Sequence, residues 1–156
     1  MLVTALCVML TGTPAAEGNM DYSEAEEIVY EFTDSSVPPQ YHRSYTIRVM
    51  RDSVHVTVDS YGEILAEAGY PITGSDHREL MEALEAAGLH LVPERENDGC
   101  TGGTTETLTI LGAEGTVFHG WVYHCGGRDY GTMEGDVAIA AEAFRTLVPD
   151  LETLKR

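Results

Sequence analysis

Short stretches in which apolar and polar residues alternate constrain this fold most, because alternation gives each face of a β-strand its own row of side chains. Residues 45–49 and 54–58 alternate in this way and are joined by a short polar turn. Residues 106–110 and 117–124 form a second such pair around a turn that contains Gly115. The sequence therefore predicts two antiparallel hairpins.

Two other segments have the spacing of amphipathic helices. Asp76 is followed by Glu79 three positions later and then by apolar residues at helical spacing, which predicts a helix over residues 76–87 with Asp76 as its N-cap. A closing helix is predicted over residues 134–148, because Pro149 cannot continue it.

The remaining patterned segments complete the fold class. Residues 28–32 alternate and predict an N-terminal strand, residues 63–70 fit either a third strand or a connecting arm, and residues 89–93 fit a short extended piece. Runs of strands interrupted by single helices are typical of an α+β fold. We expect an antiparallel sheet of two hairpins plus the N-terminal strand, with two helices packed on one face.

The N-terminus is typical of an exported protein. Residues 2–10 are uncharged and mostly apolar, and small residues follow them. This predicts a signal peptide over residues 1–16, a flexible acidic leader over 17–26 and a single α+β domain over 27–156. The alternatives are a lipid anchor through Cys7 and a buried first strand or helix. The expected location is secreted, periplasmic or at the cell surface, with no membrane insertion after the signal is removed.

The charge balance limits the classes of partner. The chain has 26 acidic and 9 basic residues, a formal net charge of -17. Such an excess argues against nucleic acid and anionic membranes as partners. It is compatible with a basic protein partner or with cation binding.

A disulfide between Cys100 and Cys125 is the main covalent prediction. Cys100 lies just before the first strand of the second hairpin and Cys125 just after the second strand. Both positions are at the open end of that hairpin, within disulfide range. Closing a loop of this size stabilises a fold by roughly 3 kcal/mol on the chain-entropy estimate.

A metal site is the alternative interpretation of the same hairpin, because His119, His124, Cys100 and Cys125 cluster in it. Alternation places His119 and Cys125 on one face of the strand and His124 on the other, so these residues do not converge on one ion. We expect no metal and no cofactor.

The sequence has no recognisable catalytic set. It lacks Gly-x-Ser-x-Gly, the phosphate-binding Gly-x-x-x-x-Gly-Lys and His-Glu-x-x-His. No catalytic residue is predicted, and the leading hypothesis is a small, exported, non-enzymatic binding domain of unknown ligand. The opposing hypothesis is a small secreted hydrolase or metal-binding protein that uses His119 or His124 with carboxylates.

Two polar and aromatic segments are candidate binding sites. Tyr41, His42 and Arg43 follow two consecutive prolines, and Arg128 and Tyr130 follow the second Cys-Gly-Gly motif. Both segments are expected to be loops, where binding residues collect. An unidentified protein is the expected partner.

The order of these elements resembles a known family. The strand at residues 28–32, the hairpin at 45–58, the helix ending at 84–88 and the terminal segment 147–151 are similar to those of small bacterial proteins of the emfourin type, and also to those of other small exported bacterial proteins and lipoproteins. The resemblance covers residues 27–151. Emfourin-like proteins inhibit thermolysin-type metalloproteases, so the resemblance implies a protease inhibitor.

The chain departs from the emfourin type in three ways: it carries the predicted export signal, it has the two Cys-containing glycine motifs, and it differs at the loop after the first strand. Residues 34–40 stand where the family has a Ser-Gly-Gly-Phe loop. The resemblance therefore assigns an inhibitory role to no particular residue. The segment from Asp34 to Arg43 is the candidate inhibitory loop by position alone.

Overall fold

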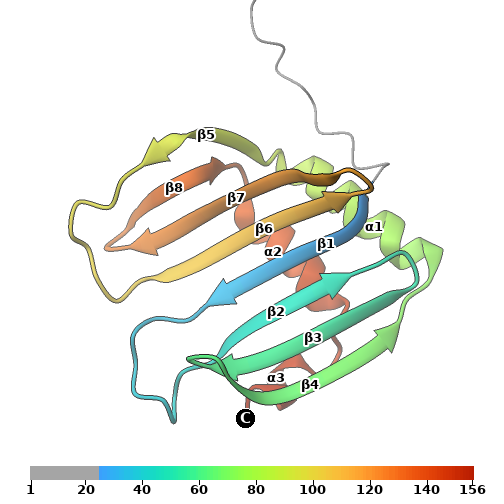
Figure 1. The fold of residues 1–156 in the computed structure, drawn as a ribbon, viewed down its shortest axis with the longest axis horizontal. Coiled ribbons are helices and arrows are strands. Elements are labelled where there is room, and N and C mark those ends of the chain that lie inside the picture. Colours follow the sequence, from blue (N-terminus) through green and yellow to red (C-terminus); the bar gives the residue numbers. More distant parts are fainter. Residues whose placement is uncertain (1–24) are drawn as a thin grey trace, which may run out of the picture.

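The computed structural model describes residues 25–156, which form one eight-stranded sheet and three helices (Figure 1). The strands are β1 Ala25–Thr33, β2 Ser44–Val49, β3 Ser53–Ser60, β4 Glu63–Pro71, β5 His90–Arg95, β6 Thr104–Gly112, β7 Gly115–Cys125 and β8 Arg128–Glu134. The helices are α1 Gly74–Ala87, α2 Val137–Thr146 and α3 Leu151–Leu154. The antiparallel sheet and the α+β class are as predicted, but the sheet is larger.

The chain crosses the full width of the sheet once and then returns to its middle. Strands β1 to β4 form a meander, and α1 then carries the chain from β4 at one edge to β5 at the other, in the order β4-β3-β2-β1-β6-β7-β8-β5. The next connection passes the ends of β8 and β7 before β6 pairs with β1. All neighbouring strands are antiparallel. Strands distant in sequence thus meet in the middle of the sheet.

The hydrophobic core lies between the sheet and the helices, which are all behind the sheet in the view of Figure 1. Val54, Val56 and Val58 are buried while His55 and Thr57 between them are half-buried, as alternation requires. The ring of Tyr30 in β1 stacks on Phe144 in α2 with 5.1 Å between centroids. Each fully buried aliphatic or aromatic side chain contributes roughly 1.5–3 kcal/mol. The helix-side core also includes Leu80 and Leu84 of α1 and Ile28, Ile47, Leu108 and Ile110 of the sheet.

Helix α1 begins earlier than the sequence predicts. Its N-cap is Thr73, whose hydroxyl accepts a hydrogen bond from the Asp76 N–H at 3.2 Å, while the Asp76 carboxylate accepts from the Thr73 N–H at 2.7 Å. The expectation that Asp76 is the N-cap is wrong, because Asp76 is the third helical residue of a reciprocal capping box. The hydrogen bonds that the Thr73 N–H and the Thr73 hydroxyl donate to the Asp76 carboxylate hold the pKa of that carboxyl below its usual value. The helix ends at Gly88, which adopts the left-handed conformation.

Several boundaries differ from the predictions. Glu134 ends β8 instead of beginning the closing helix, and α2 starts after Asp136, whose side chain accepts from the Ile139 N–H at 3.1 Å. The predicted leader overlaps β1, because Ala25 already pairs with Gly112 of β6. The predicted signal peptide and Cys7 lie outside the described residues.

Candidate functional site

Four connections meet at one end of the sheet, which we call the loop end. They are the β1–β2 loop (residues 34–43), the β3–β4 turn (61–62), the β5–β6 connection (96–103) and the β7–β8 turn (126–127). They lie toward the left and lower left of Figure 1. Because antiparallel strands alternate in direction, β1, β3, β5 and β7 all end here. The predicted binding residues all lie at this end, in or beside two of these connections.

A single carboxylate joins the two ends of the β1–β2 loop. One oxygen of Asp34 accepts from the Ser35 N–H at 2.8 Å, and the other accepts from the Arg43 N–H at 2.9 Å. The Asp34 N–H donates to the Ser44 hydroxyl at 3.0 Å. Hydrogen bonds to a charged acceptor are stronger than those between neutral groups. Asp34 therefore fixes the base of the loop from the inside.

His42 supports this loop and is not part of its surface. The residue is only 3 % exposed, and its ring stacks on Tyr61 of the β3–β4 turn with 3.8 Å between centroids. The Tyr61 N–H donates to His42 Nδ1 at 3.3 Å, so a neutral imidazole carries its hydrogen on Nε2. His42 was predicted to bind a partner, but its side chain is buried beneath the loop surface.

The same geometry decides what His42 and Ser44 can do chemically. The Ser44 hydroxyl lies 3.4 Å from His42 Nε2, a contact that suggests a nucleophile and its base. A general base needs a free lone pair on the nitrogen that faces the serine. That lone pair is absent when Nε2 carries the hydrogen, and Nδ1 has a backbone donor where a triad has a carboxylate. The pair is structural.

The tip of the loop is exposed although its backbone is held. The Tyr41 N–H donates to the Pro38 carbonyl at 2.8 Å and closes a turn, while Tyr41 itself is 68 % exposed. The hydroxyls of Tyr61 and Ser60 donate to the carbonyls of Val37 at 2.6 Å and Pro39 at 2.9 Å. Pro38, Pro39 and Gln40 are exposed with Tyr41. The result is a fixed backbone that presents apolar and aromatic side chains.

Arg43 anchors the loop to the C-terminal segment. Its Nε donates to the Lys155 carbonyl at 2.8 Å, and its Nη1 donates to the His42 carbonyl at 2.6 Å. Of the three residues predicted to bind in this segment, Tyr41 alone is exposed. His42 and Arg43 hold Tyr41 in place.

Beside the loop is an open cavity of about 360 Å³. Its lining residues include three acidic ones, Glu31, Asp34 and Asp59, and no lysine or arginine. Tyr61 forms part of its wall. The surface next to the loop is thus acidic, as the overall charge of the chain suggests.

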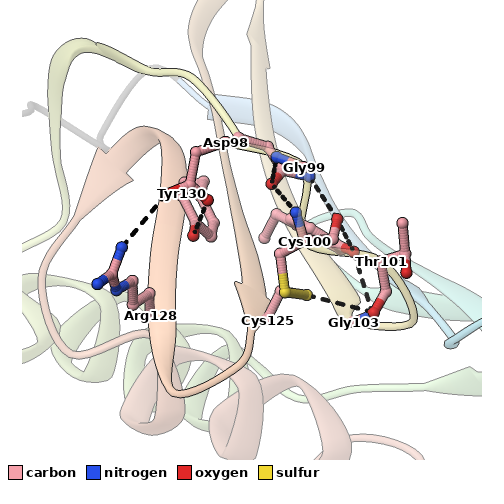
Figure 2. Close-up of a disulfide and its surroundings, with 10 residues drawn as sticks. Asp98, Gly99, Cys100, Thr101, Gly103, Cys125, Arg128 and Tyr130 are labelled. Carbon is pink, nitrogen blue, oxygen red and sulfur yellow. Dashed lines mark hydrogen bonds and ion pairs between the residues drawn. A yellow bond between two sulfur atoms is a disulfide. The ribbon is translucent and has the colours of Figure 1, made fainter.

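The β5–β6 connection is tied to the sheet by the predicted disulfide, which joins Cys100 and Cys125 with 6.0 Å between Cα atoms. Figure 2 shows this bond and the contacts of Asp98 beside it. The Asp98 carboxylate accepts from the Tyr130 hydroxyl at 2.8 Å and lies 3.3 Å from an Arg128 nitrogen. The prediction that places these cysteines at one end of the hairpin is confirmed.

The sequence predicts that Arg128 and Tyr130 lie in a loop. This prediction is wrong, because both residues belong to strand β8. Tyr130 pairs with Tyr123 of β7 and is only 7 % exposed, while Arg128 is exposed. The hydrogen bond to Asp98 raises the pKa of the Tyr130 hydroxyl.

A Cβ on Gly103 would lie 2.1 Å from the His124 carbonyl, so the β5–β6 connection packs tightly on β7.

A polar cluster surrounds His124, which the sequence offers as a candidate with unspecified carboxylates. Its Nδ1 lies 2.7 Å from an Asp129 oxygen and its Nε2 3.5 Å from a Glu106 oxygen. The other Glu106 oxygen accepts from the Tyr30 hydroxyl at 2.5 Å, and an Arg145 nitrogen lies 3.3 Å from that hydroxyl. Burial raises the pKa of Tyr30 far above its usual value, and nearby Glu106 raises it further. The sequence points to His124 alone, because its contact with Glu106, and the contacts of Glu106 and Arg145 with Tyr30, form only in the folded sheet.

His119 is separate from this cluster. It bonds Thr109 at 2.9 Å across the β6–β7 pair, on the face opposite to His124, as alternation predicts. Within residues 25–156, no three histidine, cysteine or acidic residues are placed to hold one metal ion. The described helices also include none with the length and apolar character needed to cross a bilayer.

Comparisons of this chain with protein-family models, with curated proteins and with solved structures gave no match. The resemblance to emfourin and the protease-inhibitor function that it implies therefore stay predictions.

Proposed function

We propose that this protein is an exported, non-enzymatic domain that binds another protein through the β1–β2 loop. One observation carries the proposal: the loop backbone is held by its own scaffold while the side chains at its tip are exposed. A binding loop that is already ordered loses less conformational entropy on association. A loop with this construction is suited to docking into a partner's cleft.

The composition of the tip supports a protein partner. Tyr41 offers a large, amphipathic ring with few rotatable bonds, and tyrosine is among the residues that contribute most to protein interfaces. The prolines before it further restrict the backbone. The acidic cavity beside the loop and the net charge of -17 favour a partner with a basic surface.

Inhibition of a secreted protease is the sharper form of this proposal. The emfourin resemblance suggests it, and a rigid exposed loop is what a protease cleft accepts from an inhibitor. The test is a panel of secreted metalloproteases and serine proteases assayed with the purified protein at micromolar concentration. Inhibition that Tyr41→Ala weakens supports the proposal.

The matched control is Met50→Ala. Met50 is 42 % exposed in the β2–β3 turn, at the end of the sheet opposite to the loop. Its replacement removes a comparable exposed side chain and leaves the β1–β2 loop intact. No inhibition of any protease removes the inhibitor form, and equal effects of the two variants remove the loop as its cause.

Export is part of the proposal and rests on two observations. A disulfide persists in oxidising compartments, and residues 2–10 have the composition of a signal sequence. Intact mass of the natural protein, with and without reductant, tests both. We expect a chain that begins near residue 17 and gains two hydrogen atoms on reduction. A lipid-modified Cys7 supports the anchored alternative, and an uncleaved, reduced chain contradicts export.

A second candidate function, hydrolysis, is favoured by the position of His124 between Asp129 and Glu106. A histidine between two carboxylates can move a proton. Turnover that is lost in His124→Ala and kept in His119→Ala supports this candidate. An unchanged binding activity in His124→Ala supports the first proposal.

A further inference from the structure

Strand β4 is an edge strand whose bulge, at Leu65, and proline, Pro71, lie near its two ends, so that neither interrupts the middle of the edge. Among the described residues it pairs with β3 alone, so its outer side offers unpaired backbone N–H and C=O groups. It is nine residues long, and its single proline is the last residue, Pro71. The other edge strand, β5, is shorter, contains Pro93 in its interior and pairs irregularly with β8. The regular ladder of β4 covers residues 66–71.

Exposed apolar side chains continue from the β1–β2 loop to the start of β4. Tyr61, whose hydroxyl bonds the loop at Val37, is 57 % exposed. Shortly after the β3–β4 turn, Ile64 is 59 % exposed and Leu65 is 44 % exposed. Leu65 is the extra residue of a bulge between the pairs at Ile64 and Ala66, so both of its neighbours remain in the ladder. The candidate binding loop and the β4 edge thus form one continuous surface.

The charge of this surface identifies its occupant. Glu63 and Glu67 are exposed along β4, and no lysine or arginine occurs between residues 59 and 71. The carboxylates of the adjacent cavity add to this acidic field. A second copy of the chain is a poor occupant, because both copies carry a large negative charge. Antiparallel pairing of two β4 strands centred on Glu67 also places Glu67 of one copy opposite Glu67 of the other.

We infer that the partner contributes an extended segment rich in lysine or arginine, which adds to the sheet as a further strand beside β4. Main-chain hydrogen bonds to the free edge supply affinity, and the acidic side chains select for basic residues. Ile64 and Leu65 add apolar contacts where the strand meets the loop. The inference rests on the proposed function, since it assumes that the loop end binds a protein.

The test uses a phage-displayed library of random peptides selected on the folded, oxidised protein. We expect the enriched peptides to alternate basic with β-branched or aromatic residues. In NMR titrations with a synthetic copy of an enriched peptide, the β4 backbone amides are expected to shift more than those of β5. The double variant Glu63→Lys with Glu67→Lys is expected to weaken binding roughly tenfold.

The matched control is Glu82→Lys with Glu85→Lys, which makes the same change in net charge on the exposed side of α1. Equal weakening by the two double variants overturns the inference, because it indicates only a general charge effect. Peptides without basic residues, or shifts confined to β5, overturn it as well.

Failure of the inference can be told from failure of the proposed function. Peptides that lose binding in Tyr41→Ala but keep it in the β4 double variant leave the loop proposal standing and remove the edge. Peptides that bind neither the loop nor β4, or the absence of any enriched peptide, contradict both.

Discussion

The β1–β2 loop and the β5–β6 connection leave the same end of the sheet, but different forces hold them. The loop joins neighbouring strands, and the pairing of Phe32 with Tyr45 already fixes the distance between its ends. Hydrogen bonds from Asp34 and the ring stack of His42 on Tyr61 then order what remains. Local polar contacts suffice when the sheet has fixed both ends of a loop.

The connection has a longer path and needs a stronger link. It starts at the edge strand β5, passes the ends of β8 and β7, and enters β6 in the middle of the sheet. The disulfide fastens it to β7 midway, at Cys100. Covalent closure thus replaces the constraint that a hairpin supplies to the other loop. The disulfide of the β5–β6 connection therefore has a structural role, whereas the β1–β2 loop has side chains available for binding.

Removing the disulfide is expected to have the largest effect. Replacing Cys100 and Cys125 together by serine loses about 3 kcal/mol of unfolding free energy, because the unfolded chain is no longer cross-linked. Urea unfolding measures the loss, and hydrogen exchange locates it. Amides of the connection are expected to lose protection while those of the β1–β2 loop keep it. Equal loss in both segments contradicts the separate origins of their order.

Removing the Asp34 carboxylate is expected to have the next largest effect. Asp34→Ala leaves the N–H groups of Ser35 and Arg43 without their acceptor and costs about 2 kcal/mol. Asp34→Asn keeps one acceptor oxygen and is expected to lose less. Unfolding free energies rank the three proteins. Similar stability of Asp34→Ala and the unchanged protein shows that the loop does not depend on this side chain.

The hydrogen bond from Tyr130 to Asp98 supplies a smaller, pH-dependent contribution to the connection. Because the folded protein raises the pKa of Tyr130, this contribution is complete below the unfolded pKa of about 10 and disappears as pH rises through the folded value. The stability difference between the unchanged protein and Tyr130→Phe is therefore constant at neutral pH and shrinks above pH 10. Urea unfolding at several pH values measures it. A difference that grows above pH 10 contradicts this assignment.

The smallest expected effect is that of Tyr61→Phe. The change removes the hydroxyl that donates to Val37 and keeps the ring that stacks on His42, so it costs about 0.5 kcal/mol. Unfolding free energy gives the cost, and exchange at the loop tip is expected to rise without change in the connection. A change in the connection alone contradicts the described contacts.

Local sequence patterns predicted the parts of the fold that local contacts determine. The strands β2, β3, β6 and β7 follow from the alternation of apolar and polar residues. Helix α1 follows from the helical spacing of its apolar residues, although its N-cap is Thr73 and not the predicted Asp76. Strand β8 was not predicted because the segment follows Gly126 and Gly127 and contains Asp129 and Gly131, which are typical of loops. Pairing with β7 across the two-glycine turn makes this segment a strand. Strand β5, which contains Pro93, was predicted only as a short extended piece.

The candidate site was predictable in position but not in detail. The prolines marked the loop, and their position placed Tyr41 in it. Burial of His42 depends on Tyr61, which is distant in sequence, and the position of Tyr130 depends on Asp98 in another connection. Such long-range contacts leave no periodic signal in one sequence. The disulfide was predictable because the hairpin fixed the separation of its two cysteines.

Backbone order parameters from ¹⁵N relaxation test the central claim most directly, since the claim is that the β1–β2 loop is ordered before any partner binds. They are measured on the free protein with the disulfide intact and again after reduction. We predict values near 0.85, typical of rigid backbone, for residues 34–43 in both states. Values below about 0.6 for this loop in the oxidised protein contradict the claim.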